Sequence, residues 1–91
     1  MAESSLHLKH ILVQHQYEAE DLVRKLKEGL EFSELAKKFS KCPSAKQGGD
    51  LGVLALSRLD DDFVDAARKL KALEISGVVK TSFGYHLIQR V

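Results

Sequence analysis

The first apolar segment of the chain, residues 6–13, alternates with a period of two. One side of this segment carries Leu6, Leu8, His10 and Leu12, and the other carries His7, Lys9, Ile11 and Val13. Successive side chains of a strand point to opposite faces, so the pattern predicts a strand with apolar side chains on both faces. We therefore expect a buried strand in which His10 points inward among leucines.

Three later segments have the period of amphipathic helices. Residues 17–28 place apolar side chains at helical spacing and stop before Gly29. A second helix of about two turns is expected to begin at Ser33, its N-cap, and to bury Phe39. A third helix, residues 60–71, has aspartates in its first turn and basic residues in its last, which complements the helix dipole at both ends.

The remaining segments predict strands and one long connection. Residues 52–56 form a brief strand, and residues 76–81 and 85–91 pair as a hairpin around a Phe-Gly turn. Residues 40–52, SKCPSAKQGGDLG, show neither the period of a helix nor that of a strand. A connection this long in a small domain is usually functional or disordered, and we expect it to be functional. The order βααβαββ indicates the α+β class.

Composition and charge narrow the function classes. With 44% hydrophobic and 30% charged residues, the 91 residues fit a single domain, in which we expect residues 1–5 to be disordered. A formal net charge of +1 gives no basic footprint for nucleic acid or an anionic membrane, so a nucleic-acid-binding domain is the least favoured function. Neither a signal peptide nor a membrane-spanning apolar run is evident. We expect a cytoplasmic monomer with no membrane or nucleic-acid partner.

Two histidines stand in predicted apolar strands. His86 shares its side of the last strand with Ile88, and His10 points inward in the first. If the two strands are neighbours, the imidazoles can hydrogen-bond to each other, with Thr81 or Cys42 nearby. A single inward histidine is more often a satisfied core residue than a functional one. The pair is therefore more informative than either residue alone.

The single cysteine, Cys42, precedes the single proline, Pro43, inside the long connection. A small buried hydrophobe is the commonest role of an intracellular cysteine, but a loop position weakens that interpretation. A covalent Cys–His site lacks a local signature, and a metal site lacks ligand spacing, so we expect no metal and no cofactor. The glycines of QGGDLG predict tight turns with positive φ rather than a phosphate loop.

Taken together, three segments resemble the parvulin family of peptidyl-prolyl cis/trans isomerases. They are HILV at 10–13, EFSELAKKFSKCPSAKQGGDLG at 31–52 and ISGVVKTSFGYHLI at 75–88, in the family's order and spacing. The resemblance implies the βα₃βαβ₂ fold, a four-stranded antiparallel sheet surrounded by helices. It also implies faster rotation of X-Pro bonds in unfolded or flexible protein segments, which assists folding. The alternative on this fold is a noncatalytic proline-peptide-binding or chaperone module.

Carried over position by position, the resemblance implies two groups of site residues. The catalytic group is His10, Cys42 and His86. The substrate-binding group is Leu51, Leu54, Leu59, Phe63, Thr81 and Phe83. Leu59 and Phe63 correspond to the floor of the proline pocket, and we expect Phe63 to serve proline binding more than fold stability.

The chain departs from the family pattern at several places, among them Leu59, where the family more often has Met, and Arg68, where it usually has Phe. One branch of the family binds a phosphate with a basic cluster after the first strand, where this chain has QHQ at 14–16 followed by acids. The resemblance therefore implies a phosphate-independent isomerase. The acidic run LDDDF at 59–63 is expected to disfavour acidic substrates beside the proline pocket. Ala72-Leu73 stand where the family usually has Pro-Gly, a change that we interpret as structural.

Overall fold

Four antiparallel strands form one sheet in the order β2-β1-β4-β3. The structure is a computed structural model and describes residues 4–91. Its elements in chain order are β1 (Ser5–Val13), α1 (Gln16–Lys27), α2 (Phe32–Phe39), the 3₁₀ helix η1 (Pro43–Gln47), β2 (Asp50–Ala55), the 3₁₀ helix η2 (Leu56–Arg58), α3 (Asp61–Arg68), β3 (Val79–Thr81) and β4 (Gly84–Arg90). The predicted α+β class and antiparallel sheet are confirmed.

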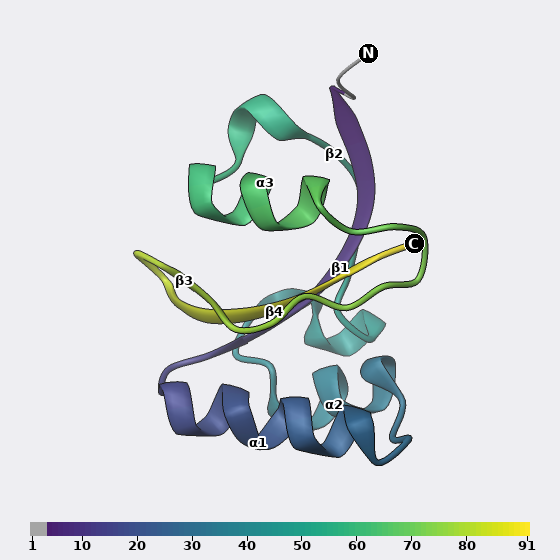
Figure 1. The fold of residues 1–91 in the computed structure, drawn as a ribbon, viewed down its shortest axis with the longest axis vertical. Helices are drawn as coiled ribbons and strands as arrows, with labels where there is room; N and C mark the ends of the chain where they lie inside the picture. The colour runs from purple at the N-terminus through teal and green to yellow at the C-terminus, as the bar shows by residue number, and fades with distance from the viewer. Residues whose placement is uncertain (1–3) are drawn as a thin grey trace.

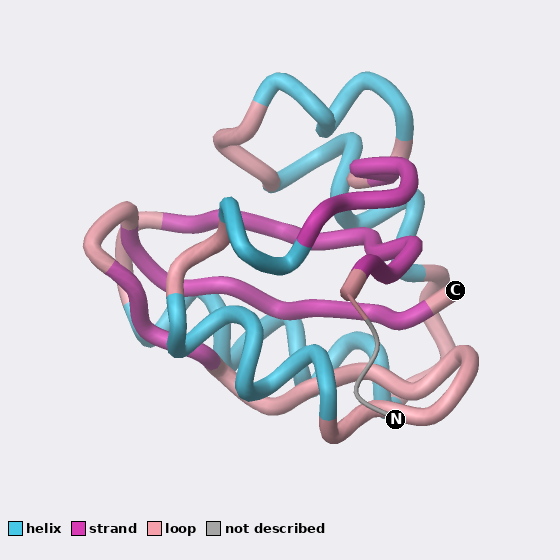
Figure 2. Tube along the Cα trace, turned by 90° about the horizontal axis from the view of Figure 1, so that it is seen from above, coloured by secondary structure: helices cyan, strands magenta, loops and turns pink. Residues whose placement is uncertain are grey.

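The helices cover both faces of the sheet. In Figure 1, α3 lies above β3 and β4, whereas α1 and α2 lie below them, and Figure 2 shows the strands side by side from above. The two-sided pattern of β1 explains this arrangement. Leu6 and Leu8 join the core under α3, whereas Ile11 and Val13 join the core over α1 and α2.

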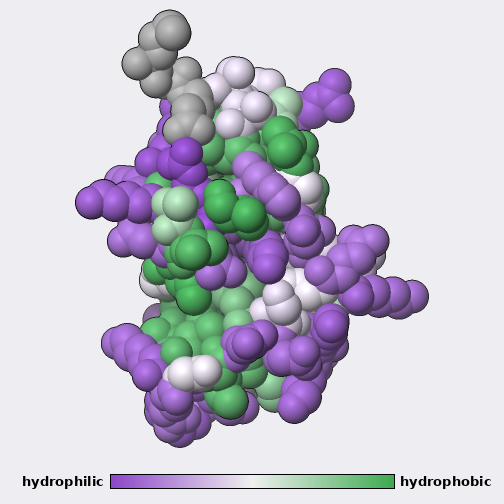
Figure 3. Space-filling model, turned by 90° about the vertical axis from the view of Figure 1, so that its right-hand side faces the viewer, coloured by the Kyte–Doolittle hydropathy of each residue, from purple (hydrophilic) through white to green (hydrophobic). Residues whose placement is uncertain are grey.

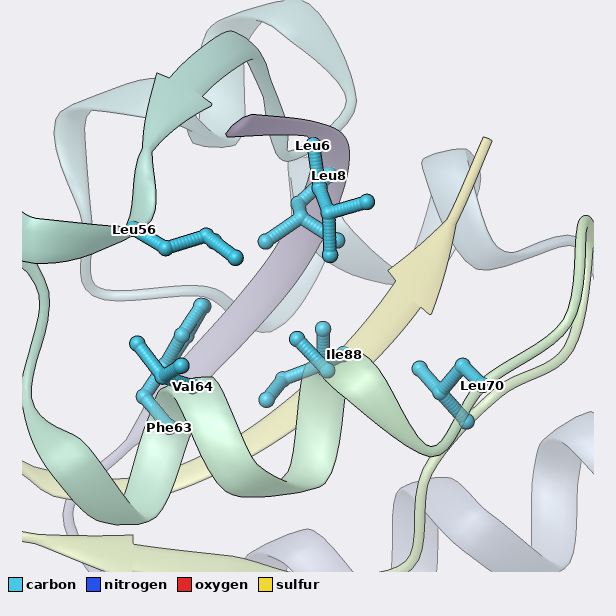
Figure 4. Packing of buried hydrophobic residues seen from close by; sticks show 8 residues of the cluster. Leu6, Leu8, Leu56, Phe63, Val64, Leu70 and Ile88 are labelled. Atoms are coloured by element: carbon cyan, nitrogen blue, oxygen red, sulfur yellow. The ribbon is translucent and has the colours of Figure 1, made fainter. Parts of the chain in front are cut away.

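The core on the α3 side positions the functional residues described below. Its buried members are Leu6, Leu8, Leu56, Phe63, Val64, Ala67, Leu70 and Ile88, most of which are labelled in Figure 4. Side chains of α3 point in that view toward those of β1 and β4. Each fully buried side chain of this size contributes about 1.5–3 kcal/mol, so this cluster fixes α3 on the sheet.

The second helix differs from its prediction in where it begins and in the exposure of Phe39. It begins one residue before Ser33, with Glu31 as N-cap, because the buried ring of Phe32 draws the chain into the helix earlier. The Ser33 hydroxyl instead accepts a hydrogen bond from Lys9 Nζ at 3.2 Å. Phe39, predicted to be buried, is 39% exposed, and Lys25 Nζ lies 4.5 Å from the centroid of its ring.

The long connection after α2 is more regular than the sequence indicated. Pro43 opens the 3₁₀ helix η1, and β2 begins at Asp50, two residues before the predicted strand. Gly48 and Gly49 both have positive φ, as the turn prediction required. The third helix is shorter than predicted: it spans Asp61–Arg68, with Asp60 as its N-cap.

Disorder was predicted for residues 1–5. Residues 1–3 lie outside the described residues. Ser5 is the first residue of β1, and the Ser4 carbonyl accepts the Leu56 N–H at 3.0 Å, so residues 4 and 5 are ordered, contrary to the prediction.

Several large apolar side chains are exposed, among them Leu30, Leu73 and Ile75. On the face shown in Figure 3, hydrophobic areas alternate with hydrophilic ones. Within residues 4–91, no helix has the length and apolar character to cross a membrane.

Candidate active site

A cleft of about 330 Å³ opens on the α3 side of the sheet. Its wall combines β1, β2, the η2–α3 segment, the β3–β4 hairpin and the connection that holds Cys42. The lining residues are His10, Leu12, Cys42, Leu51, Leu54, Arg58, Leu59, Asp60, Phe63, Thr81, Phe83 and His86. Every site residue predicted from the sequence therefore lines this one cleft, although these residues are dispersed over most of the chain.

The two histidines meet because β1 and β4 are neighbours in the sheet. His10 Nδ1 and His86 Nδ1 lie 3.1 Å apart, and both side chains are buried. Thr81 Oγ1 lies 2.7 Å from His86 Nε2. The predicted hydrogen bond between the histidines, with Thr81 nearby, is confirmed.

The available donors and acceptors determine which atom donates in each of these hydrogen bonds. The Phe83 N–H donates to Thr81 Oγ1 at 3.2 Å, and the Thr81 hydroxyl donates its own proton to His86 Nε2. His86 then carries its proton on Nδ1 and donates it to Nδ1 of His10, whose proton lies on Nε2. Among the described residues only His10 Nε2 is left unpaired in this network. The reverse direction would also leave the Thr81 proton without an acceptor.

Burial keeps both imidazoles neutral. Desolvation, and after it the neighbouring His86, lower the pKa of His10 from 6.5 to about 4. Burial also lowers the pKa of His86, and the Asp60 carboxylate acts in the opposite direction. Neutral imidazoles are poor sources of positive charge but good hydrogen-bonding groups. The pair is therefore suited to hold the wall of the cleft in a fixed geometry.

Cys42 is held at the cleft by the backbone around it. The Lys41 N–H donates to the Leu12 carbonyl at 2.7 Å, and the Leu12 N–H donates to Ser40 Oγ at 3.1 Å. These bonds fix the connection beside β1 and leave the thiol half-buried and free. No cluster of His, Cys, Asp or Glu side chains within residues 4–91 is arranged to hold a metal ion.

Leu59, Phe63 and Phe83 differ in how they contribute to the apolar wall. Leu59 is half-buried, and Phe83 is 75% exposed on the β3–β4 turn, at the rim of the cleft. Phe63 is only 5% exposed and belongs to the core as well as to the cleft. Its ring contacts both histidines edge-on, at centroid distances of 5.8 and 5.3 Å. One ring therefore serves both the core and the cleft, and the expectation that Phe63 serves proline binding more than fold stability stays a prediction.

Three lining residues were not among the individual site residues named from the sequence: Leu12, Arg58 and Asp60. Leu12 lies on the same face of the strand as His10, so the alternation of residues 6–13 could have predicted its place in the cleft. Arg58 ends η2, a short turn with no sequence period that would orient its side chain. Of the three aspartates in LDDDF only Asp60 lines the cleft, whereas Asp61 lines a separate depression with Asp65 and Arg68.

Sequence comparison relates the chain to known folding proteins. Residues 10–91 match the Rotamase family, described as the PPIC-type PPIASE domain. The chain is 44% identical over 89 residues to the foldase protein PrsA of Bacillus subtilis, covering 97% of this chain and 30% of that protein. It is 42% identical to the foldase protein PrsA of Clostridium kluyveri, covering 26% of it. The chain thus spans less than a third of the length of these relatives.

Solved structures give the same relationship. The crystal structure of Bacillus subtilis PrsA superimposes with a TM-score of 0.92 at 44% identity, covering 97% of this chain and 35% of PrsA. The solution structure of NmPin, the parvulin of Nitrosopumilus maritimus, superimposes with a TM-score of 0.84 at 41% identity. That match covers 99% of this chain and 98% of NmPin. The chain therefore belongs to the family of PPIC-type peptidyl-prolyl cis/trans isomerase domains, the parvulins.

Proposed function

We propose that this protein accelerates cis/trans rotation about X-Pro bonds in unfolded or flexible protein segments and so assists folding. The observation that carries the proposal is the apolar cleft with the neutral His10–His86 pair in its wall. A prolyl ring is apolar and lacks an N–H, so it can enter such a cleft without leaving a donor unpaired. Peptides and unfolded proteins containing proline are the substrates that this site favours.

The reaction needs no bond to break. Rotation about an X-Pro bond is opposed by amide resonance, with a barrier of about 18–20 kcal/mol. An enzyme accelerates it by binding the twisted amide more tightly than either planar form. Rate gains of about 10³–10⁵ correspond to about 4–7 kcal/mol. Fixation of the prolyl ring by Leu59, Phe63 and Phe83, with one or two hydrogen bonds, supplies energies of this size.

In this mechanism the three polar residues have different roles. Cys42, half-buried on the cleft wall, acts without a covalent bond, near the carbonyl of the residue before proline. His10 and His86 act as positioning residues, because both ring nitrogens of His86 and Nδ1 of His10 are engaged in hydrogen bonds within the pair and with Thr81. Desolvation in the cleft also disfavours the charge-separated resonance form of the amide and so eases its rotation.

The proposal is tested by a protease-coupled isomerisation assay on X-Pro peptides with X varied through Leu, Arg, Glu and phosphoserine. We expect acceleration for unphosphorylated peptides, and a loss of about five- to thirtyfold in kcat/KM for Leu59→Ala, which removes apolar surface from the cleft. Leu30→Ala, the same change at an exposed residue outside the cleft, serves as the matched control.

Each other outcome excludes part of the proposal. Binding without acceleration for any X would indicate the noncatalytic module, and a strong preference for phosphoserine would contradict phosphate independence. Complete loss of turnover in Cys42→Ser, with fold and binding intact and an adduct trapped on the wild-type thiol, would contradict the noncovalent role. The monomeric state and the cytoplasmic location stay predictions of the sequence.

A further inference from the structure

Only two of the residues that line the cleft carry a formal charge. They are Arg58, the last residue of η2, and Asp60, the N-cap of α3. The other lining residues are apolar or uncharged, including the two histidines, which burial keeps neutral. A charged substrate side chain in this cleft would therefore meet one cation and one anion.

The Asp60 carboxylate already accepts a hydrogen bond within the protein. Asp60 Oδ1 accepts the Asp62 N–H at 3.0 Å, which caps α3. The carboxylate also lies at the positive end of the helix dipole, which offsets part of its charge. Asp61 and Asp65 line another depression, beside Arg68. The acidic run therefore presents less uncompensated charge to the cleft than its sequence suggests.

The cation is not engaged. Arg58 is exposed, and its guanidinium makes no hydrogen bond or ion pair among the described residues. A guanidinium offers five N–H donors in a planar fork that matches a carboxylate. On this part of the cleft wall, the Arg58 guanidinium is thus a positively charged donor without a partner among residues 4–91. A carboxylate complements it in both charge and shape.

The proposed function places this donor relative to the peptide. Cys42 lies on the part of the cleft wall that the connection after α2 forms, whereas Arg58 lies on the part that η2 and the start of α3 form. With the prolyl ring at Leu59 and Phe63, and the preceding carbonyl toward Cys42, the residue after proline would leave the ring toward Arg58, which directly precedes Leu59 in the chain.

We propose that Arg58 selects a carboxylate side chain on the residue that follows proline, so that Pro-Glu and Pro-Asp segments are preferred substrates. The inference rests on the proposed function and adds a specificity that the family relationship does not assign. An exposed ion pair contributes little, so we expect a preference of about two- to fivefold over the neutral isostere. The preference should disappear at about 0.5 M salt, where exposed charges are screened.

The test measures kcat/KM by NMR exchange on Ala-Leu-Pro-Z-Phe peptides with Z as Glu, Gln or Lys. Wild-type protein should favour Glu over Gln by about two- to fivefold and disfavour Lys. Arg58→Gln should bring the Glu/Gln ratio to about one, and Arg58→Glu should reverse the order of Glu and Lys. Lys69→Gln makes the same change in net charge at an exposed residue outside the cleft, and it should keep the wild-type ratio.

The outcomes separate this inference from the proposed function. Acceleration of all three peptides with equal kcat/KM, or with Lys preferred, would overturn the role of Arg58 and leave the isomerase activity standing. A Glu preference that survives Arg58→Gln would overturn it as well. Acceleration of none of the peptides would instead overturn the proposed function. Thermal unfolding of each variant checks that the substitution leaves the fold intact.

Discussion

At the scale of single residues, the Thr81 hydroxyl determines where the protons of the histidine pair lie. It accepts the Phe83 N–H and donates to His86 Nε2. This leaves His86 with its proton on the nitrogen that faces His10. One hydroxyl outside the pair thus selects one tautomer for both rings and removes the need for either to be charged.

Thr81→Val tests this role, because it keeps the shape of the side chain and removes the hydroxyl. His86 Nε2 would then be buried without a partner, so we expect a loss of about 1–3 kcal/mol in the free energy of unfolding. Side-chain ¹⁵N spectra should show a changed tautomer for His86. Thr81→Ser restores the hydroxyl and should restore the wild-type tautomer. An unchanged ¹⁵N spectrum in Thr81→Val would contradict the assignment.

Leu73 carries the clearest backbone strain in the described part of the chain. It is the only residue other than glycine there with positive φ, 69°, and its side chain is 71% exposed. Its N–H donates to the Arg90 carbonyl at 2.7 Å, which holds the turn against β4. A left-handed conformation costs an L-residue about 1–2 kcal/mol, and an exposed leucine recovers little of this by packing. The glycine of the family pattern fits this position for that reason.

Leu73→Gly should therefore raise the free energy of unfolding by about 0.5–1 kcal/mol, since glycine removes the strain but loses more backbone entropy. Urea denaturation measures the change. Leu73→Ala, which keeps the strain and removes the exposed side chain, is the control and should leave stability close to that of the wild type. A gain of the same size in Leu73→Ala would show that backbone strain is not the cause.

At the scale of elements, the cleft depends on a close approach between the connection after α2 and β1. The His10 N–H donates to the Gly49 carbonyl at 2.9 Å. A Cβ atom at Gly49 would lie 2.4 Å from the His10 carbonyl oxygen, and the φ of Gly49 is +83°. Glycine is therefore required both for the backbone conformation and for the contact that brings this connection against the strand of His10.

Gly49→Ala should lower the free energy of unfolding by about 2 kcal/mol or more, because positive-φ strain and the clash with β1 act together. Chemical shifts of Cys42 and His10 should move as the connection shifts. Gly77→Ala is the matched control: Gly77 has no positive φ, and a Cβ there would meet nothing within 4 Å. Comparable losses in the two variants would contradict the close-approach argument.

Strand parity made the histidine pair predictable from the sequence. His10 and His86 each lie on the side of their strand that carries apolar neighbours, so pairing of β1 with β4 was enough to bring them together. Regular periods also located the helices. Helix ends were less predictable, as Ser33 shows, because burial of Phe32 outweighed the capping preference of serine.

Features that depend on irregular backbone were not predictable. Arg58 reaches the cleft through η2, and neither helical nor strand periodicity describes such a turn. Asp60 lines the cleft and Asp61 lines another depression because α3 begins between them, and the sequence does not predict a helix start to within one residue. The exposure of Phe39 depends on how α2 is rotated against its neighbours. Tertiary packing sets each of these, and the local sequence does not.

At the scale of the whole molecule, the core and the cleft share residues. Phe63 and the two histidines are buried in the fold and line the cleft at the same time. The neutral state of the histidines is consequently a property of the folded chain. Unfolding returns them to water, where the pKa of histidine is about 6.5. Stability and the integrity of the cleft should therefore share one dependence on pH.

The sign follows from the lowered pKa of His10, about 4 in the folded chain against 6.5. The stabilising effect is complete above the unfolded pKa and is lost as pH falls toward the folded one, because only the unfolded chain then takes up the proton. We expect the free energy of unfolding to drop by about 2 kcal/mol or more between about pH 7.5 and about pH 5, a range in which most carboxylates stay ionised.

Urea denaturation at the two pH values measures this loss. His15→Asn removes an exposed histidine and should keep the full pH dependence of the wild type. A free energy of unfolding that stays constant over this range would contradict the neutral, buried state of the pair.

The central claim is that this cleft catalyses X-Pro rotation, and NMR exchange spectroscopy on an Ala-Leu-Pro peptide tests it most directly. With catalytic amounts of protein, we expect cis/trans exchange cross-peaks that are absent for the peptide alone. With excess peptide, we expect shifts confined to residues that line the cleft, such as Cys42, Leu59 and Phe83. Shifts at the cleft without exchange cross-peaks would contradict catalysis, and exchange with shifts elsewhere would contradict the site.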